Sequence, residues 1–459
     1  MLPKQVKSRD ASRNVPTPPA LAIINQRIDA LKLNPDNPRR RSAQAKRQLK
    51  HSIETFDFNV PILVDARGNV ICGSSRVEAA RELGYEELPT ILIDHLDEQR
   101  LRAFMIAENR ISETGEWKDD ILAKHLQILM SESLDFEIEA IGFDYPEIEF
   151  RVQSLSADSA SDGETDRADC VPEAPDVPIS KEGDIWICGH HRVACGNSLD
   201  EAVYAVLMAG KRAGMVFTDA PYNCKIPGHV SGKGAVKHPN FAMGCGEMSA
   251  EQFIEFLTSV NLWIAKHTVL GAVIYQCMDF RHMPELLTAA AGAKFEHLNT
   301  CVWIKHNAGM GSFYRSQYEN VAVFKNGKGR HRNNVQLGKY GRHRSNVWHY
   351  RGANVFGGQT DEGNLLALHP TVKPVALVQD AILDCSVIGD IVLDPFLGVG
   401  TVLIAAERSG RRCFGIEISP TYVDRTIRRW QTYCGSEARH AVTNKTFAET
   451  ARERTALTD

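Results

Sequence analysis

Short apolar runs and helical stretches alternate along the second half of the chain. The apolar runs have the length of strands, and stretches with apolar residues at helical spacing separate them. This order predicts an α/β fold with a doubly wound, Rossmann-like sheet. The predicted strands are 214–218, 272–277, 300–304, 320–324, 391–394 and 413–418.

A smaller α+β unit is predicted in the first half. An apolar run at 62–64 is followed by an Arg-Gly-Asn turn at 67–69, and Val77, Ala80 and Leu83 then lie at helical spacing. This pattern indicates strand, turn, strand and helix. No DNA-reading helix-turn-helix is obvious after this unit.

Composition suggests where the chain divides. Residues 156–178 hold seven acids, one Arg and many Ala, Ser and Pro, and such a segment buries too little apolar surface to order itself. The expected parts are a disordered leader at 1–20, a first domain at 21–150, an acidic linker at 151–180, a second domain at 181–436 with a basic segment at about 325–352, and a polar tail at 437–459.

The 459 residues, 43% hydrophobic and 24% charged, are typical of a protein with two or three domains. The chain has neither an apolar run of the roughly 20 residues that span a bilayer nor a secretion signal at its start, so we expect a cytoplasmic protein without a membrane role. Eleven cysteines without a CxxC pair argue against a disulfide framework. The stretch Cys188–Cys195 could ligate a metal, but it also reads as two strands around a turn, and we predict no metal site.

A glycine-rich turn follows the predicted strand at 391–394. Gly398 and Gly400 allow the backbone to turn tightly and approach a ligand. Glu417 ends the next strand about 20 residues on, where an acid can accept hydrogen bonds from both ribose hydroxyls. The third glycine of a pyrophosphate-binding turn is missing. Together these features predict a ligand that contains adenosine but no phosphate, and S-adenosylmethionine is the common one.

Four motifs of the second unit resemble those of the amino-group DNA methyltransferases, which modify adenine or cytosine. They read TDAPYN, LHPTVKPVALVQDAIL, LDPFLGVGT and GIEISPTY. Their order, with the catalytic motif first and the cofactor motif last, resembles the permuted β class of that family. The resemblance implies S-adenosylmethionine as cofactor and double-stranded DNA as substrate.

The catalytic motif of that family stands here as Asp219-Ala220-Pro221-Tyr222. The resemblance implies that the Asp219 carboxylate and the carbonyl of Ala220 accept hydrogen bonds from the target amine and stabilise its developing charge. It also implies that Tyr222 stacks on a base swung out of the duplex. Ala220 stands where the family has proline, so the loop keeps the carbonyl but loses the fixed φ.

The resemblance also implies a set of cofactor residues. Asn197 occupies the place of an acid that the family holds near the adenine ring, and Lys373 belongs to the HPTVKP motif beside the methionine end, with His369 and Thr371. Lys373 could equally be a surface residue at a helix start. The expected set is Asp394, Pro395, Phe396, Gly398, Gly400, Thr401, Glu417, Lys373 and Asn197.

The segment at about 325–352 carries many cations and aromatic residues and no acid. Cations neutralise phosphates and aromatic rings stack on displaced bases, so this composition suits DNA. A solvated basic loop is the alternative. The expected DNA-contacting residues are Arg315, Arg330, Arg332, Lys339, Arg342, Arg344 and Trp348.

The first unit resembles the ParB-like N-terminal domain, a fold shared with sulfiredoxin-type proteins, through NPDNPRR, GNVICGSSRVEAARELG and IAENRISE. The resemblance implies a phosphate or nucleotide site at a helix start. Ser74, where many relatives have His or Glu, argues against nucleotide hydrolysis, and Arg76 could instead pair with Glu78 or Glu82. The candidate residues are Gly73, Ser75, Arg76, Glu108 and Asn109.

These features predict a site-specific DNA methyltransferase with adenine N6 as its target, because cytosine N4 enzymes of the family more often have Ser in place of Asp219. Cytosine N4, RNA and a protein amide are alternative targets. A different class of function is a nucleotide-gated, ParB-like DNA-binding protein with a vestigial methyltransferase domain, which Ala220 and Asn197 would favour. The sequence fits a restriction–modification enzyme or an orphan methylase, and it fits a dimer as well as a monomer.

Overall fold

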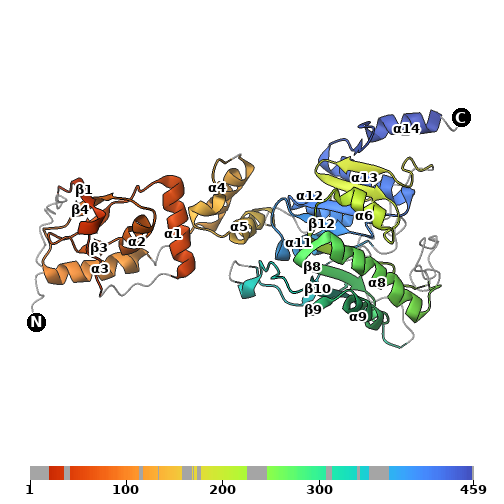
Figure 1. Cartoon of the computed structure of the whole chain (residues 1–459), viewed down its shortest axis with the longest axis horizontal. Helices are drawn as coiled ribbons and strands as arrows, with labels where there is room; N and C mark the ends of the chain where they lie inside the picture. Colours follow the sequence, from red (N-terminus) through yellow and green to blue (C-terminus); the bar gives the residue numbers. More distant parts are fainter. Residues whose placement is uncertain are drawn as a thin grey trace, which may run out of the picture. The chain divides into compact units, whose positions relative to one another are not determined.

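The computed structural model places the chain in two compact units, Met1–Ala157 and Asp158–Asp459, which Figure 1 shows. Each unit is described by itself. The residues that the structure describes are 20–35, 42–112, 117–132, 134–157, 168, 170–172, 177–224, 246–305, 313–338, 342–350 and 372–456.

A four-stranded sheet forms the centre of the first unit, in the order β1-β4-β2-β3. The predicted strand, turn, strand and helix are confirmed as β2, β3 and α2. Ile62, Val64 and Leu88 of the sheet pack with Val77 of α2 in one core. The elements are β1 (Ile23–Arg27), η1 (Ile28–Ala30), α1 (Ala43–Phe56), β2 (Ile62–Val64), β3 (Val70–Cys72), α2 (Ser74–Glu82), β4 (Glu87–Leu92) and α3 (Glu98–Ser112).

Two further helices, α4 (Asp119–Ser131) and α5 (Tyr145–Ala157), with the short η2 (Ile138–Ile141) between them, complete the first unit. Arg151 of α5 forms ion pairs with Glu147 and with Asp119 at the start of α4. Because α5 runs to Ala157, the expected linker boundary at 151 lies inside a helix and was wrong.

Ten strands form the sheet of the second unit, in the order β11-β9-β10-β8-β7-β12-β13-β6-β5-β14. The neighbours β8, β7, β12, β13 and β6 are parallel, so their carboxyl ends lie at one edge. All six predicted strands are present. The strands are β5 (Ile185–Cys188), β6 (His191–Cys195), β7 (Ala213–Thr218), β8 (Thr268–Met278), β9 (Phe295–Ile304), β10 (Tyr318–Asn326), β11 (Val347–His349), β12 (Ile391–Asp394), β13 (Arg412–Glu417) and β14 (Arg439–His440).

Helices cover both faces of this sheet, which confirms the doubly wound fold. Helices α6, α8 and α9 contribute Leu207, Phe253 and Leu286 to one core, and α11, α12 and α13 contribute residues such as Leu377 and Leu403 to the other. The helices are α6 (Glu201–Met208), α8 (Ala250–His267), α9 (Met283–Gly292), α11 (Val375–Cys385), α12 (Thr401–Arg408) and α13 (Pro420–Cys434).

The end of the chain is ordered, contrary to the expected polar tail at 437–459. Strand β14 pairs with β5, and α14 (Phe447–Ala456) follows. Phe447 is buried against Trp186, with ring centroids 5.2 Å apart, and Arg454 forms an ion pair with Asp184. Strand pairing, the burial of Phe447 and contacts of His440 and Arg454 with Asp184 hold a segment whose composition is otherwise polar.

The far end of the expected linker is likewise part of the second unit. The backbone N–H groups of Ile179 and Ser180 donate to the Asp424 carboxylate at 2.5 and 2.9 Å. Among the residues described, no helix has the length and apolar character needed to cross a bilayer.

Candidate active site

The candidate site lies at the carboxyl edge of the large sheet, where β7 and β12 are neighbours. The chain leaves β7 for a helix on one face and β12 for a helix on the other. Open α/β sheets bind ligands at such a switch point. Asp219 follows β7, Asp394 ends β12 and Glu417 ends β13, so the fold brings three predicted site residues to one edge.

Four side chains from three separate segments form a closed polar cluster around Asp219. The Tyr222 hydroxyl lies 2.6 Å from both Asp219 Oδ1 and Glu319 Oε1. Lys373 Nζ lies 2.5 Å from Asp219 Oδ2 and 2.8 Å from Glu319 Oε1. We call Asp219, Tyr222, Glu319 and Lys373 the acidic tetrad. The structure thus places Lys373 beside the expected catalytic motif.

The tetrad has two carboxylates and one ammonium group, and a second ammonium group, from Lys305, contacts Glu319 from outside the tetrad. Lys305 Nζ is 2.7 Å from Glu319 Oε2. Burial opposes ionisation of Glu319, but Lys373 and Lys305 outweigh it and lower its pKa to about 2. Burial raises the pKa of Asp219, Lys373 opposes this shift and the charge of Glu319 adds to it. The two acids therefore differ in basicity although they share partners.

Tyr222 is a hydrogen-bond donor in this cluster. Burial raises the pKa of its hydroxyl well above the ordinary value, and the charges of Asp219 and Glu319 add to the effect. A neutral phenol has one proton, so it donates to one carboxylate at a time.

The loop 219–224, which bears the expected catalytic motif, is held by packing and by Asn223. Ala220 is buried in the core on the α8 side, and Pro221 is half-buried. Asn223 Oδ1 accepts the backbone N–H groups of Gly246 and Met248 at 3.0 and 3.2 Å, and its Nδ2 donates to the Met248 carbonyl at 2.8 Å. These contacts hold a loop that lacks the family's first proline.

Asp394 ties the ends of two strands together. Its Oδ1 accepts hydrogen bonds from the Thr218 hydroxyl at 2.9 Å and from the Phe396 N–H at 3.0 Å. Burial raises its pKa to about 7 against these hydrogen bonds, and the charge of Asp219 contributes. Pro395 beside it is buried.

The glycine-rich turn is in close contact with α13. Gly400 has φ of 80°, and a Cβ there would lie 2.7 Å from Thr426 Cγ2. The Thr426 hydroxyl donates to the Gly398 carbonyl at 3.0 Å. Thr401 is buried and accepts from Arg429 at 3.2 Å. Gly400 and Thr401 thus serve helix packing in this structure.

Glu417 is held in a fixed orientation at the end of β13. Its Oε2 accepts the Gly398 N–H and its Oε1 accepts the Ser419 N–H, both at 2.8 Å. Burial raises its pKa to about 7, and these backbone donors oppose the shift. A buried carboxylate with both oxygens oriented can still accept further hydrogen bonds, since each oxygen has two lone pairs.

Asn197 lies beside Glu417 but supports a turn. Its Oδ1 accepts the Leu199 N–H at 2.9 Å, an arrangement typical of an Asx turn. The preceding Gly196 N–H donates to the Glu417 carbonyl at 2.9 Å. Asn197 is therefore at the same carboxyl edge of the sheet as Glu417, next to the main chain of β13.

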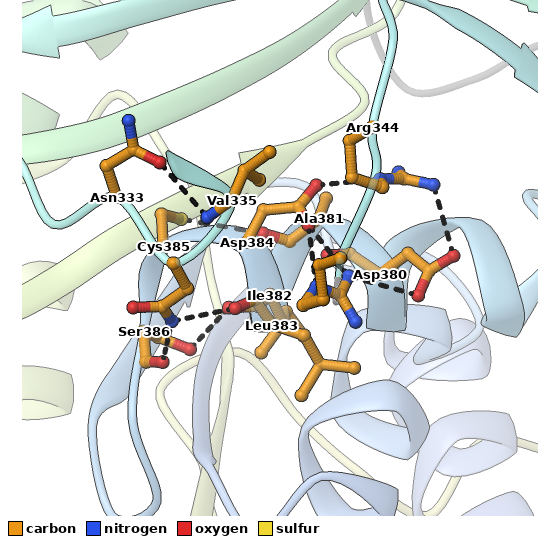
Figure 2. A network of polar contacts seen from close by, with 12 residues as sticks. Asn333, Val335, Arg344, Asp380, Ala381, Ile382, Leu383, Asp384, Cys385 and Ser386 are labelled. Carbon is orange, nitrogen blue, oxygen red and sulfur yellow. Dashed lines mark hydrogen bonds and ion pairs between the residues drawn. The ribbon is translucent and has the colours of Figure 1, made fainter. Parts of the chain in front are cut away.

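Two of the expected DNA-contacting residues, Arg342 and Trp348, are buried and a third, Arg344, is half-buried, which corrects their assignment. Figure 2 shows Arg344 in contact with Asp380 and Asp384 of α11. Arg342 Nη2 lies 2.7 Å from Asp384 Oδ1, and Arg344 contacts Asp384 Oδ2 at 3.1 Å and Asp380 Oδ2 at 3.2 Å. The guanidinium of Arg344 stacks over the ring of Trp348, which is itself buried. We call Arg342, Arg344, Asp380 and Asp384 the arginine clamp.

The other residues expected to contact DNA are not buried where the structure describes them. Arg315, Arg330 and Arg332 are exposed. Lys339, together with His369 and Thr371 of the HPTVKP motif, lies outside the described residues.

Sequence reasoning missed Glu319 and an aromatic pair. Glu319 is an acid next to a predicted apolar strand, and this position was its only signal. Phe313 and Tyr314 are 87% and 84% exposed, and their ring centroids lie 4.4 Å apart.

The candidate phosphate site of the first unit has a glycine at the start of α2. Gly73 has φ of 104°, and a Cβ would lie 2.6 Å from Ile62 Cδ1. Burial raises the pKa of the neighbouring Cys72 to about 12, with a contribution from Glu108 that Arg76 opposes, so these three side chains are close.

Arg76 donates to the Val60 carbonyl at 3.1 Å. The two acids that were its alternative partners have other contacts, since Glu78 pairs with Lys46 at 2.8 Å and Glu82 with Lys50 at 3.7 Å. Ser75 lies in the first turn of α2 and is half-buried, and Asn109 donates to the Met105 carbonyl at 2.8 Å.

The stretch Cys188–Cys195 forms a hairpin of β5 and β6, as its strand pattern predicted. His191 Nε2 lies 2.7 Å from Glu407 Oε2, and its Nδ1 accepts the Cys413 N–H at 2.8 Å. Both ring nitrogens are thus occupied by protein groups.

Comparison with protein families identifies three segments. Residues 213–428 match the DNA methylase model of the N6/N4 type, residues 19–110 the ParB N-terminal domain, and residues 120–182 the ParB-methyltransferase HTH domain. The chain thus combines segments matched to ParB proteins with a segment matched to DNA methylases, and we refer to it as the fusion. The third match identifies a helix-turn-helix domain where none was obvious in the sequence, and most of α4, with η2 and α5, lies within its range.

Two curated relatives of the fusion share short stretches with it. The DNA adenine methyltransferase YhdJ of Escherichia coli is 51% identical over 61 residues, which are 13% of this chain and 21% of the relative. The type II methyltransferase M.ScaI of Streptomyces caespitosus is 32% identical over 105 residues, which are 23% of this chain and 32% of the relative. The matches span a third or less of each relative.

Among solved structures, the PvuII DNA methyltransferase, described as cytosine-N4-specific, is similar at 13% identity and a TM-score of 0.40. The similarity covers 62% of the fusion and 96% of that chain.

Proposed function

We propose that the fusion is a site-specific DNA methyltransferase that transfers a methyl group from S-adenosylmethionine to the exocyclic amine of a flipped base. The observation that carries this proposal is the position of Asp219, whose carboxylate lies at the switch point of a domain matched to the DNA methylase family. The glycine-rich turn and Glu417 lie at the same edge.

The residues present fit the proposed cofactor. S-adenosylmethionine supplies an electrophilic methyl group on a sulfonium centre. Glu417 is a buried acid whose oriented oxygens suit two ribose hydroxyls, and the absence of a side chain at Gly398 leaves room for close approach. Two further residues are candidates for contacting the cofactor. Lys373 belongs to the tetrad, and Asn197 lies beside β13.

The tetrad suits an amine acceptor. The side chain of Asp219 is 23% exposed, compared with 9% for Glu319 and 6% for Lys373, so Asp219 is the most accessible of the three charged members. Its carboxylate and the Ala220 carbonyl would accept the two amine hydrogens and stabilise the positive charge that develops on nitrogen. Tyr222 would stack on the base.

Adenine N6 is the proposed target because the first motif residue is Asp219. Cytosine N4 is the alternative, and the same geometry of acceptors would serve its amine. The fusion would act on DNA in the cytoplasm.

Exposed cations and rings would bind the duplex. Arg315, Arg330 and Arg332 are proposed to neutralise phosphates. Phe313 and Tyr314 are proposed to stack on unpaired bases. In the first unit, Gly73 and Arg76 at the start of α2 would hold a nucleotide phosphate.

The test is transfer of labelled methyl from S-adenosylmethionine to unmethylated genomic DNA, with the product nucleosides separated by mass spectrometry. N6-methyladenine is expected. N4-methylcytosine would correct the target base only. Cofactor binding by calorimetry without methylated nucleosides would contradict the proposal and favour a DNA-binding protein with a vestigial methylase domain.

A further inference from the structure

Glu319 shares both hydrogen-bonding partners of Asp219. Tyr222 Oη is equally distant from the two carboxylates, at 2.6 Å, and Lys373 Nζ is 2.5 Å from Asp219 and 2.8 Å from Glu319. The two acids are 100 positions apart in sequence and belong to the loop after β7 and to β10. The reaction proposed above assigns no role to Glu319.

We propose that Glu319 is a positioning residue that makes Asp219 the proton acceptor of methyl transfer. This inference rests on the proposed function. Glu319 binds the ammonium group of Lys373, which weakens the attraction of Lys373 for Asp219. It also lies within hydrogen-bond distance of the Tyr222 hydroxyl.

The reaction requires a proton acceptor. When the nitrogen–carbon bond forms, the carbon–sulfur bond breaks and its electron pair stays on sulfur, which becomes a neutral thioether. The nitrogen is then positively charged and must lose a proton. The carboxylate of Asp219 takes it and later releases it to solvent, so protons and charge balance.

Lys373 alone would make Asp219 a weak base. A cation at hydrogen-bond distance favours the ionised carboxylate and lowers its pKa. Because Glu319 binds the same ammonium group, the attraction is divided between two acids. Lys305 adds a second cation on the far side of Glu319. Glu319 is thereby kept ionised as a fixed anion that repels negative charge on Asp219.

The groups that face Asp219 come from every neighbouring element. Lys373 lowers the pKa of Asp219 and Glu319 raises it. Asp394 of β12 and Asp219 influence each other, as do Cys277 of β8 and Asp219. Lys305 of the β9 end acts through Glu319. Environments that separate two acids in basicity mark a proton acceptor and its supporting group.

The decisive variant is Glu319→Gln, which keeps the shape and removes the charge. Without Glu319, the whole charge of Lys373 acts on Asp219, whose pKa falls. The acid limb of the kcat–pH profile should move down by about one pH unit, and kcat on the plateau should fall about tenfold or more because a weaker base accepts the proton less readily. Glu319→Asp should return the acid limb to its wild-type position.

The matched control is Glu296→Gln. Glu296 of β9 pairs with Lys325 of β10 at 2.8 Å, so it is a carboxylate–lysine pair across the same two strands but outside the tetrad. This control should leave the profile unchanged.

A second variant predicts the opposite shift. Lys305→Gln removes a cation from the border of the tetrad, which raises the pKa of Asp219, and the acid limb should move up. Lys305 is 35% exposed, so folding should tolerate the change. A merely structural role of Glu319 would not produce shifts of opposite sign.

Direct titration separates this inference from the proposed function. Carbon-13 NMR of aspartate carboxyl groups in the full chain, with the Asp219 signal assigned through Asp219→Asn, reports ionisation without turnover. The Asp219 midpoint should be lower in Glu319→Gln than in wild type. An unchanged midpoint overturns the inference even if DNA is methylated, whereas a shifted midpoint without any methyl transfer in the wild type leaves the electrostatic role intact and refutes the proposed reaction.

Discussion

The acidic tetrad and the arginine clamp are two buried charge clusters in one domain, and they differ in the type of cation. The clamp uses guanidinium groups, whose planar forks bind carboxylates in fixed geometry. The tetrad uses an ammonium group and a phenol, which have fewer directional demands and can exchange partners. The comparison indicates that the arginine clamp holds the segment around residues 342–344 against α11, whereas the acidic tetrad can rearrange its hydrogen bonds during a reaction.

The largest expected effect breaks the clamp. Asp384→Asn removes the charge that binds both arginines and leaves Asp380 as their remaining acid, and because Arg342 is buried the change should lower the free energy of unfolding by about 3–5 kcal/mol. Thermal unfolding of the full chain measures this loss. Asp380→Asn is the matched control, because Asp380 is 34% exposed and its loss should have a smaller effect. Equal effects of the two variants would argue against the clamp as a buried ion-pair network.

The next effect breaks the tetrad. Asp219→Asn preserves shape but removes the acceptor charge, so kcat should fall about a hundredfold or more while the thermal midpoint changes little. The measurement is methyl transfer to DNA together with calorimetric binding of S-adenosylmethionine, which should be unchanged. Activity at the wild-type rate would remove Asp219 from the mechanism.

Glu417 is a third buried acid that can be compared with those of the tetrad and the clamp. The hydrogen bonds found for it come from backbone N–H groups and not from a cation. Its pKa is raised to about 7, and ribose hydroxyls bind the ionised form better. Cofactor affinity should therefore fall as pH drops below about 7, by up to about tenfold per pH unit. Titration calorimetry at several pH values checks this.

Glu417→Gln is the control for that pH dependence. It should bind the cofactor more weakly and with a smaller slope below pH 7. The same slope in the variant would assign the titration to another group, with Asp394 the first candidate, since its pKa is also about 7.

The smallest expected effect concerns the cations outside both clusters. Arg332→Gln removes one exposed charge, so DNA affinity should weaken similarly for all sequences, and the slope of log affinity against log salt should fall by about one. Fluorescence anisotropy at several salt concentrations measures it. Arg344→Gln should instead destabilise the fold, and a pure salt-slope effect from it would contradict the clamp.

The sequence predicted the strands and the site edge because both depend on local patterns. Apolar runs become central strands, and a motif after each strand reaches the same edge when the strands are parallel. Asp219, Asp394 and Glu417 could therefore be predicted together.

Contacts between residues far apart in the sequence could not be predicted from local patterns. The basic segment looked like a DNA-binding surface because Asp384, its partner, is 42 residues from Arg342. Lys373 and Asp219 are 154 residues apart, so nothing local showed that they meet. The order of the C-terminal residues depends on contacts with a distant segment, such as Phe447 against Trp186 and Arg454 with Asp184, which composition does not reveal.

The hydrogen bond from Thr218 to Asp394 joins the end of the strand that precedes the catalytic loop to the end of the strand that enters the glycine-rich turn. The two halves of the site are thereby held at a set spacing. Under the proposed function, an inhibitor that links an adenosine group to a nucleobase through a rigid spacer would therefore have one preferred spacer length, and a series of such compounds would measure the distance between cofactor and base.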